Sequence, residues 1–226
     1  MLCATVACGS AKEDTSRTDS TPLARTAEVG SAEGAAPAPG AGGRQVLIIG
    51  TSLTAGYGLE DPSDAYPAVM QRMADSAGYS ISVQNGGLSG ETSAGALRRV
   101  DWLLRTPYDV VVVETGANDG LRGLDVDSTR ANLRGIIAAI RQKSPGARIA
   151  LVQMEAPPNM GVAYTTRFHE TFGVVAREAG VTLLPFILDG VAGVDTLNQR
   201  DGIHPNPKGA RIVAANLWQS LAPLVR

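Results

Sequence analysis

Short apolar runs alternate with amphipathic helical patterns from residue 44 onward, and this alternation constrains the fold more than any other feature. Four apolar runs are typical of strands buried on both faces of a sheet, and they lie at 46–49, 110–113, 149–152 and 181–184. A weaker fifth strand is predicted at 81–83. Between the runs, apolar residues recur at the spacing of one helix face, as in Tyr66, Val69, Met70 and Met73. The alternation predicts one α/β domain of three layers, α/β/α, around a five-stranded, doubly wound parallel sheet.

The first 43 residues have a different composition from the rest. Residues 11–43 are rich in Ser, Thr, Ala, Gly and Pro and lack apolar periodicity, so we expect a disordered linker. Residues 1–10 look like the clipped end of a lipoprotein signal, with small residues before Cys8, the expected lipidation site. This predicts an exported lipoprotein of the cell envelope, on the periplasmic side or at the cell surface. A cytoplasmic protein with incidental cysteines is the alternative.

Charge and the rare residue types exclude several function classes. Lys plus Arg is 20 and Asp plus Glu is 22, a net charge of -2, so there is no general field to attract nucleic acid. The only cysteines, Cys3 and Cys8, exclude a disulfide framework and a thiolate zinc site in the body of the protein. Histidine occurs only at His169 and His204. No H-E-x-x-H motif surrounds His169, which we expect on a helix surface, and no metal or cofactor is predicted.

Four loops carry small or polar residues where predicted strands end or before the last helix, the edge at which parallel sheets bind ligands. They contain Gly50-Thr-Ser52-Leu53, Gly90, Gly116-Ala-Asn118-Asp119 and Asp201-Gly-Ile-His204-Pro205. In this order the segments resemble the SGNH (GDSL-type) hydrolase family, in its bacterial thioesterase I, lysophospholipase and arylesterase branch. The resemblance covers residues 44–226. One residue departs from it: Thr51 stands where the family has Asp, and it can hydrogen-bond nearby backbone without bringing a charge.

The resemblance and the chemistry of the residues imply the same roles. Ser52 would attack an ester or thioester carbonyl, His204 would act as base and then acid, and Asp201 would fix the imidazole. Ser52, Gly90 and Asn118 would form the oxyanion hole. Ser52 lacks the G-x-S-x-G elbow of the α/β-hydrolases, so we expect the triad on a flavodoxin-like sheet. The predicted function is hydrolysis of small esters or thioesters with short-to-medium acyl groups, through an acyl-enzyme on Ser52.

The predicted substrate-binding residues are Leu53, Leu121, Arg122, Leu124 and Pro157. Gly120 and Gly123 flank apolar residues, which suits a flexible flap over an acyl chain. The segment 154–160, which contains Pro157, would form another wall. Arg122 would either meet a phosphate or face solvent.

Each motif also has an ordinary structural interpretation. Ser52 could cap a helix, 118–120 could be a simple turn, and Asp201 could begin a turn that leaves His204 on the surface. It is less probable that all four segments match the pattern by coincidence than that they form one functional site. Two other functions stay open at this point: a carbohydrate acetyl esterase of the same family, and a non-catalytic binding module on the same fold.

Overall fold

The computed structural model describes residues 43–226, which form a five-stranded sheet in the order β2-β1-β3-β4-β5. The strands are β1 Arg44–Gly50, β2 Ile81–Gly87, β3 Val110–Val113, β4 Arg148–Val152 and β5 Thr182–Leu184. All four strand pairings are parallel. The predicted α/β fold class is therefore confirmed. The predicted signal remnant, with Cys8, and the linker up to residue 42 lie outside the described residues.

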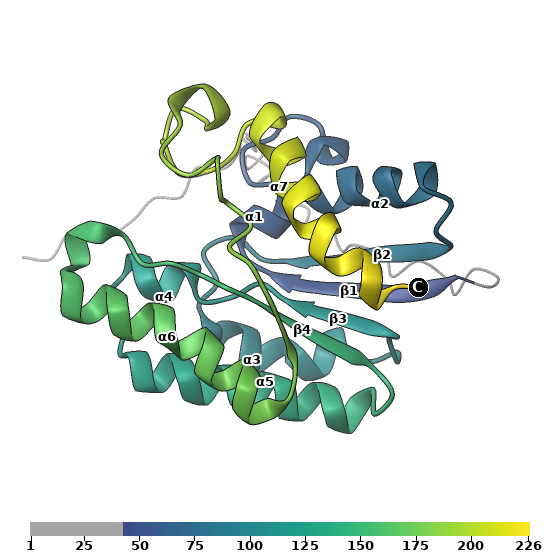
Figure 1. Cartoon of the computed structure of the whole chain (residues 1–226), viewed down its shortest axis with the longest axis horizontal. Helices are drawn as coiled ribbons and strands as arrows, with labels where there is room; N and C mark the ends of the chain where they lie inside the picture. Colours follow the sequence, from purple (N-terminus) through teal and green to yellow (C-terminus); the bar gives the residue numbers. More distant parts are fainter. Residues whose placement is uncertain (1–42) are drawn as a thin grey trace, which may run out of the picture. The chain divides into compact units, whose positions relative to one another are not determined.

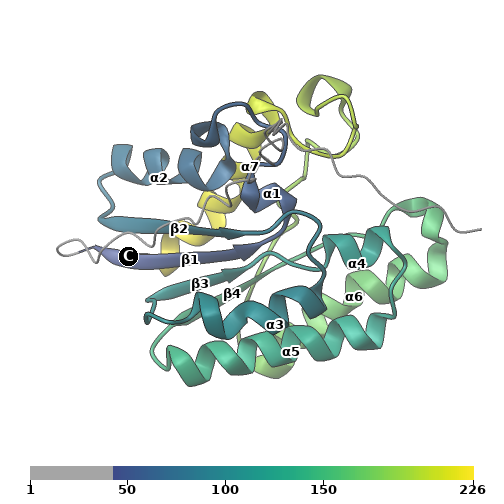
Figure 2. The same ribbon diagram turned by 180° about the vertical axis from the view of Figure 1, so that it is seen from behind.

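Helices cover both faces of the sheet (Figures 1 and 2). They are α1 Ser52–Ala55, α2 Tyr66–Ser76, α3 Ser93–Leu103, α4 Ala117–Leu121, α5 Val126–Lys143, α6 Val162–Ala179 and α7 Pro207–Leu221. Short 3-10 turns lie at Pro62–Asp64, Pro158–Met160, Asp195–Leu197 and Ala222–Leu224. Helices α2 and α7 pack together on one face, whereas α3, α5 and α6 pack side by side on the other. No helix within residues 43–226 combines the length and the apolar character needed to cross a bilayer.

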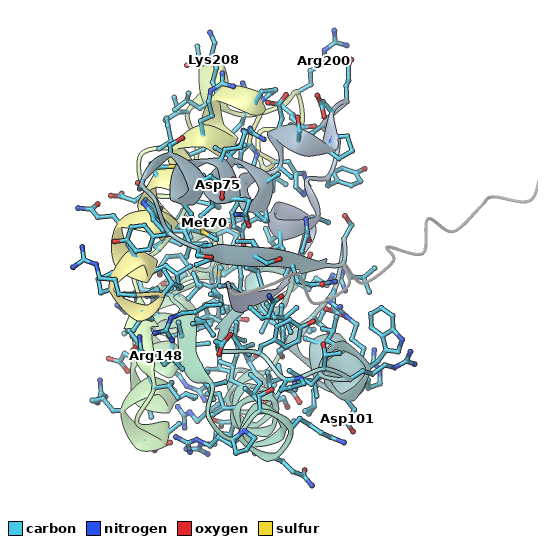
Figure 3. All side chains as sticks on the ribbon, turned by 90° about the vertical axis from the view of Figure 1, so that its right-hand side faces the viewer. Met70, Asp75, Asp101, Arg148, Arg200 and Lys208 are labelled. Atoms are coloured by element: carbon cyan, nitrogen blue, oxygen red, sulfur yellow. The ribbon has the colours of Figure 1, made fainter. Side chains whose placement is uncertain are left out.

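The core lies where the central strands meet these helices. The side chains of 46–49 and 110–113 are completely buried, as expected for strands covered on both faces. Met70 of α2 is also fully buried, and it lies among the side chains that fill the space between α2 and the sheet (Figure 3). Arg200 and Lys208 instead project from the surface in the same view. The apolar stripe predicted for α2 therefore faces the sheet.

Two strand predictions need correction. The segment 181–184 is not buried on both faces, because β5 is the edge strand and leaves Leu183 40% exposed. The strand predicted at 81–83 continues to Gly87, since Asn85, Gly86 and Gly87 pair with the end of β1. Glycine is required at position 87, because a Cβ there would lie 2.2 Å from the backbone nitrogen of Ala55.

The sheet order places several loops at one edge. β1 lies between β2 and β3, so the chain changes direction across the sheet after β2. The loops that follow β1, β2 and β3 therefore leave neighbouring carboxyl ends. In Figure 1 these ends point to the left, toward α1 and α4, and the segment between β5 and α7 reaches the same side.

Candidate active site

Ser52, His204 and Asp201 form a continuous hydrogen-bonded chain. Ser52 is the first residue of α1, directly after β1, and its Oγ lies 2.9 Å from His204 Nε2. His204 Nδ1 lies 2.6 Å from Asp201 Oδ2. The three side chains come from the β1–α1 turn and from the loop before α7, which are separated by 152 positions. The structure thus brings together all three residues predicted as a triad.

The Asp201 carboxylate is held by its own loop. Its Oδ1 accepts hydrogen bonds from the backbone nitrogens of Ile203 (2.9 Å) and His204 (3.0 Å). Hydrogen bonds from the backbone and side chain of His204 lower the pKa of Asp201 to about 2. An ionised Asp201 accepts a hydrogen bond from the Nδ1–H of a neutral imidazole. Nε2 is then free to accept a hydrogen bond from the Ser52 hydroxyl. The geometry therefore suits a base aimed at Ser52.

Two residues fix the position of the His204 loop. The ring of Tyr57 lies 4.7 Å from the imidazole of His204, centroid to centroid. Gln199 Nε2 donates to the carbonyl oxygens of Tyr57 (2.7 Å) and Pro205 (3.1 Å), and so ties this loop to the loop after α1. Sequence reasoning missed both residues. Their signal is weak, because neither lies within a recognisable motif.

The other two predicted oxyanion residues, Gly90 and Asn118, lie in neighbouring segments that contact each other. Gly90 has φ +75°, in the left-handed region that favours glycine. Asn118, in α4, donates one Nδ2 hydrogen to the carbonyl of Glu91, the neighbour of Gly90 (2.9 Å). Arg122 Nη2 donates to the carbonyl of Gly90 itself (2.9 Å). Asn118 retains a second N–H for another acceptor.

Arg99 and Asp119 support these loops from beneath, and sequence reasoning missed both supports. Arg99 Nη2 donates to the carbonyl oxygens at the ends of two strands, Gly86 (2.7 Å) and Gly50 (3.3 Å). Its guanidinium also pairs with the largely buried carboxylate of Glu91 at 2.6 Å. Asp119 Oδ2 accepts from the backbone nitrogen of Ser93 at the start of α3 (2.8 Å). The Ser52, Gly90 and Asn118 loops are therefore connected to one another through buried polar contacts.

The residue at 51 makes a contact that sequence reasoning also missed. Thr51 donates from its backbone nitrogen and from its hydroxyl to the carboxylate of Glu114, both at 2.9 Å. Glu114 follows β3 directly and is fully buried. A charged residue immediately after four valines was the available signal. The expectation that Thr51 bonds to nearby backbone is wrong, because its hydroxyl reaches a distant side chain.

The predicted substrate residues fall into two groups. Leu53, largely buried, lines a small hollow together with Ser52, His204 and Tyr57. The second group borders the Asn118 loop. There, Leu121, Arg122 and Leu124 are exposed and Pro157 is half-buried.

The segment 120–124 is attached to its surroundings rather than free. Gly120 is buried inside α4, where a Cβ would lie 3.2 Å from Ala156 Cα, so it serves close packing and not a hinge. Tyr164 donates to the carbonyl of Leu124 (2.8 Å). Arg122 is exposed, in line with one of its two expected roles, and it also donates to the Gly90 carbonyl. The prediction of a flexible flap is therefore wrong for Gly120.

The ordinary interpretations of the motifs can also be compared with the structure. Thr51, not Ser52, is the N-cap residue of α1, and Ser52 Oγ bonds to His204. Asn118 lies in a helix rather than a simple turn. His169 has a largely exposed side chain on α6, as expected, and bonds to Glu155 at 2.7 Å. Within residues 43–226, no cluster of His, Cys, Asp or Glu could hold a metal ion.

Comparisons with known proteins agree with this geometry. The model of the GDSL-like lipase/acylhydrolase family matches residues 48–212. Esterase TesA of Pseudomonas aeruginosa is 37% identical over 186 residues, which cover 82% of this chain and 91% of the relative. Thioesterase 1/protease 1/lysophospholipase L1 of Escherichia coli K12 is 37% identical over 181 residues, 80% of this chain and 84% of the relative.

A solved structure gives the same result at the level of the fold. The psychrotrophic esterase EstA from Pseudoalteromonas, in a crystal structure inhibited by monoethylphosphonate, superposes with a TM-score of 0.75. The two chains are 33% identical, and the match covers 80% of this chain and 97% of that one. The resemblance stated from the four sequence segments is confirmed. The chain belongs to the GDSL-like lipase/acylhydrolase family.

Proposed function

We propose that this chain hydrolyses carboxylic esters and thioesters of short-to-medium acyl groups through an acyl-enzyme on Ser52. The observation that carries the proposal is the hydrogen-bonded chain from Ser52 through His204 to Asp201. Membership of an acylhydrolase family supports ester hydrolysis, and the relatives named esterase and thioesterase 1/lysophospholipase L1 support these substrate classes.

Acylation begins when His204 Nε2 takes the proton of the Ser52 hydroxyl. The Oγ then bonds to the substrate carbonyl carbon, and the carbonyl oxygen becomes negatively charged. His204 returns the proton to the departing alcohol or thiol as the C–O or C–S bond breaks. Asp201, ionised because its pKa is about 2, stabilises the imidazolium between the two transfers.

The oxyanion requires donors that are already in place. The backbone N–H groups of Ser52 and Gly90 and the second N–H of Asn118 supply them in this proposal. One such donor is worth about 2.7–4 kcal/mol in the transition state. Asn118 is suited to the task because its contact with the Glu91 carbonyl fixes the orientation of its amide. Deacylation repeats these steps with water in place of Ser52.

The hollow beside Ser52 bears on the length of the acyl group. It encloses only about 10 Å³ next to Ser52 and His204, so it does not hold a long acyl chain. Its other walls include the apolar side chains of Leu59 and Val213. A longer acyl chain would extend out of it along the exposed Leu121 and Leu124.

A fluorophosphonate probe tests the nucleophile. The wild type should be labelled on Ser52, and Ser52→Ala should lose both the label and ester hydrolysis. Ser76→Ala is the matched control, since Ser76 is an exposed serine on α2. An unlabelled wild type, or a Ser52→Ala variant with full activity, would exclude this mechanism.

A substrate panel tests the substrate class. The panel contains acyl esters from C2 to C16, the corresponding thioesters and acetylated sugars. We expect the highest kcat/KM for the shorter acyl esters and thioesters. A strong preference for an acetylated sugar would replace the proposal with a carbohydrate acetyl esterase.

We further propose that the protein is exported to the cell envelope and anchored through a lipid on Cys8. The support is the arrangement of residues around Cys8 in the sequence. Mass spectrometry of the protein expressed from its full native gene should find a lipidated Cys8. An unmodified N-terminus would refute the anchor.

A further inference from the structure

Glu114 is a buried carboxylate directly beneath the turn that carries Ser52. It is the first residue after β3, and its backbone nitrogen donates to Ile49 of β1 (2.8 Å), which keeps it at the end of the neighbouring strand. Its Oε2 accepts from the backbone nitrogen of Thr51 (2.9 Å) and from Thr54 Oγ1 (2.7 Å). Its Oε1 accepts from Thr51 Oγ1 (2.9 Å). Three donors from one turn therefore converge on this carboxylate.

Burial at this position is energetically unfavourable for an ionised carboxylate. Glu114 is fully buried and forms no ion pair within the described residues. Burial raises its pKa to about 7, against the opposing effect of the hydrogen bonds from Thr54 and Thr51. An apolar or amide side chain would avoid this cost. A buried unpaired carboxylate next to a reactive serine therefore indicates a function beyond packing.

Glu114 supports the turn where the turn lacks a side-chain cap of its own. Helix α1 has only four residues, and Thr51 at its N-cap makes no side-chain cap hydrogen bond. The Thr51 hydroxyl is directed to Glu114 instead. Space around the carboxylate is also filled: a Cβ at Gly50 would lie 2.7 Å from Glu114 Oε2. Glu114 thus holds the Gly50–Thr51 peptide through the Thr51 N–H, while the Thr51 carbonyl accepts from the backbone nitrogen of Ala55 within α1 (2.9 Å).

The charged groups around the turn are few. From α2, Tyr66 lies 2.6 Å from Thr54 Oγ1, and burial followed by the charge of Glu114 raises the pKa of Tyr66 well above its usual value. From α3, Arg99 contacts the Gly50 carbonyl (3.3 Å) and is paired with Glu91. His204 contacts Ser52. Among these groups, Glu114 is the one whose pKa is raised toward neutral pH.

We propose that ionised Glu114 is a positioning residue that holds the Thr51–Ser52 turn so that Ser52 meets His204. Protonation would turn one carboxylate oxygen from an acceptor into a donor, while the Thr51 N–H stays a fixed donor. With the proton on Oε1, the Thr51 hydroxyl would have to accept from the carboxyl group instead of donating to it, the charge-assisted contacts to the turn would weaken, and acylation would slow. This inference rests on Ser52 being the nucleophile, as proposed above. In this chain an Asp at position 51 would place a second carboxylate against Glu114, whereas Thr51 supplies two donors to it.

Glu114→Gln tests the proposal, with Glu170→Gln on the exposed surface of α6 as the matched control. Glutamine keeps the size of the side chain but can never be ionised. With a soluble short-chain p-nitrophenyl ester at pH 8, we expect kcat of Glu114→Gln to fall roughly tenfold and KM to change less than twofold. The control should match the wild type. Fluorophosphonate labelling of Ser52 should slow by the same factor as kcat.

The pH profile separates positioning from a general loss of structure. The titration of Glu114 should contribute to the acid limb of the wild type and be missing from that of Glu114→Gln. Thr51→Val provides a second variant if Glu114→Gln does not fold. It removes one donor to the carboxylate, which disfavours the charged form, so the acid limb should move to higher pH.

Circular dichroism identifies which variants are folded. A folded Glu114→Gln with the kcat and the acid limb of the wild type would overturn the proposal. So would an unmoved acid limb in Thr51→Val. In both cases an active, labelled wild type would leave the proposed function intact, whereas a wild type that neither hydrolyses the ester nor reacts with the probe would refute that function first.

Discussion

The buried carboxylate of Glu114 should make stability depend on pH in a specific direction. Its pKa is 4.5 in an unfolded chain and about 7 in the folded protein, so the folded state binds the proton more tightly. Its contribution to the free energy of unfolding is therefore complete below pH 4.5, falls as the pH rises, and is lost above about pH 7. A rise in pKa of this size corresponds to about 3 kcal/mol.

Urea unfolding of the wild type and Glu114→Gln, followed by circular dichroism at several pH values from 4.5 to 8, measures this quantity. The free energy of unfolding of the wild type should fall relative to the variant by about 3 kcal/mol across that range. All other ionisable groups are present in both chains and cancel in the difference. The substitution also changes hydrogen bonds, but that effect does not depend on pH.

A difference between the two chains that stays constant across the range would refute the reasoning. It would mean that the folded protein holds Glu114 in a single protonation state throughout. A free energy of unfolding of the wild type that rises with pH relative to that of the variant would also refute it, because the hydrogen bonds from Thr51 and Thr54 would then outweigh the cost of burial.

Four further substitutions test other parts of the structure. His204→Ala should abolish ester hydrolysis while His169→Ala preserves it, since the His169 side chain is 60% exposed and contacts Glu155; equal losses in a rate assay would contradict this. Asp201→Asn should lower kcat roughly 10³–10⁴-fold with little change in KM, because an amide favours the wrong imidazole tautomer, and a loss below tenfold would exclude that role. Gly87→Ala should lower Tm by about 5 °C or more in calorimetry, because its Cβ would meet the Ala55 nitrogen at 2.2 Å; an unchanged Tm would show that the turn yields.

The fold could be predicted from the sequence where burial is symmetric. The runs at 46–49 and 110–113 are apolar on both faces because the strands lie at the centre of the sheet. The run at 181–184 has three apolar residues of four, yet it forms an edge strand with Leu183 exposed. The position of a strand within a sheet depends on which strands pair with it, and the sequence of one apolar run does not determine its partners.

The candidate triad could be predicted because each of its residues lies in a short motif at a strand end or before a helix. The supports could not, since they act over long separations in the chain. Glu114 contacts Thr51 across 63 positions, and Arg99 contacts Gly50 across 49. Each belongs to a helix or strand pattern that explains it without reference to the site. Only the packed structure shows which of these charged groups face the reactive turn.

The loop that carries Asp201 and His204 has a thermal consequence. Amide side chains hold it together: Asn198 donates to Val191 and Val194, and Asn206 donates to Thr196. Its links to the Ser52 side of the site are the Gln199 side chain and the contacts of His204 with Ser52 and Tyr57. Such a loop can open locally while the five strands remain folded. Heat would then separate the base from the nucleophile before the sheet melts, and loss of turnover would report this opening at temperatures where circular dichroism still records a native protein.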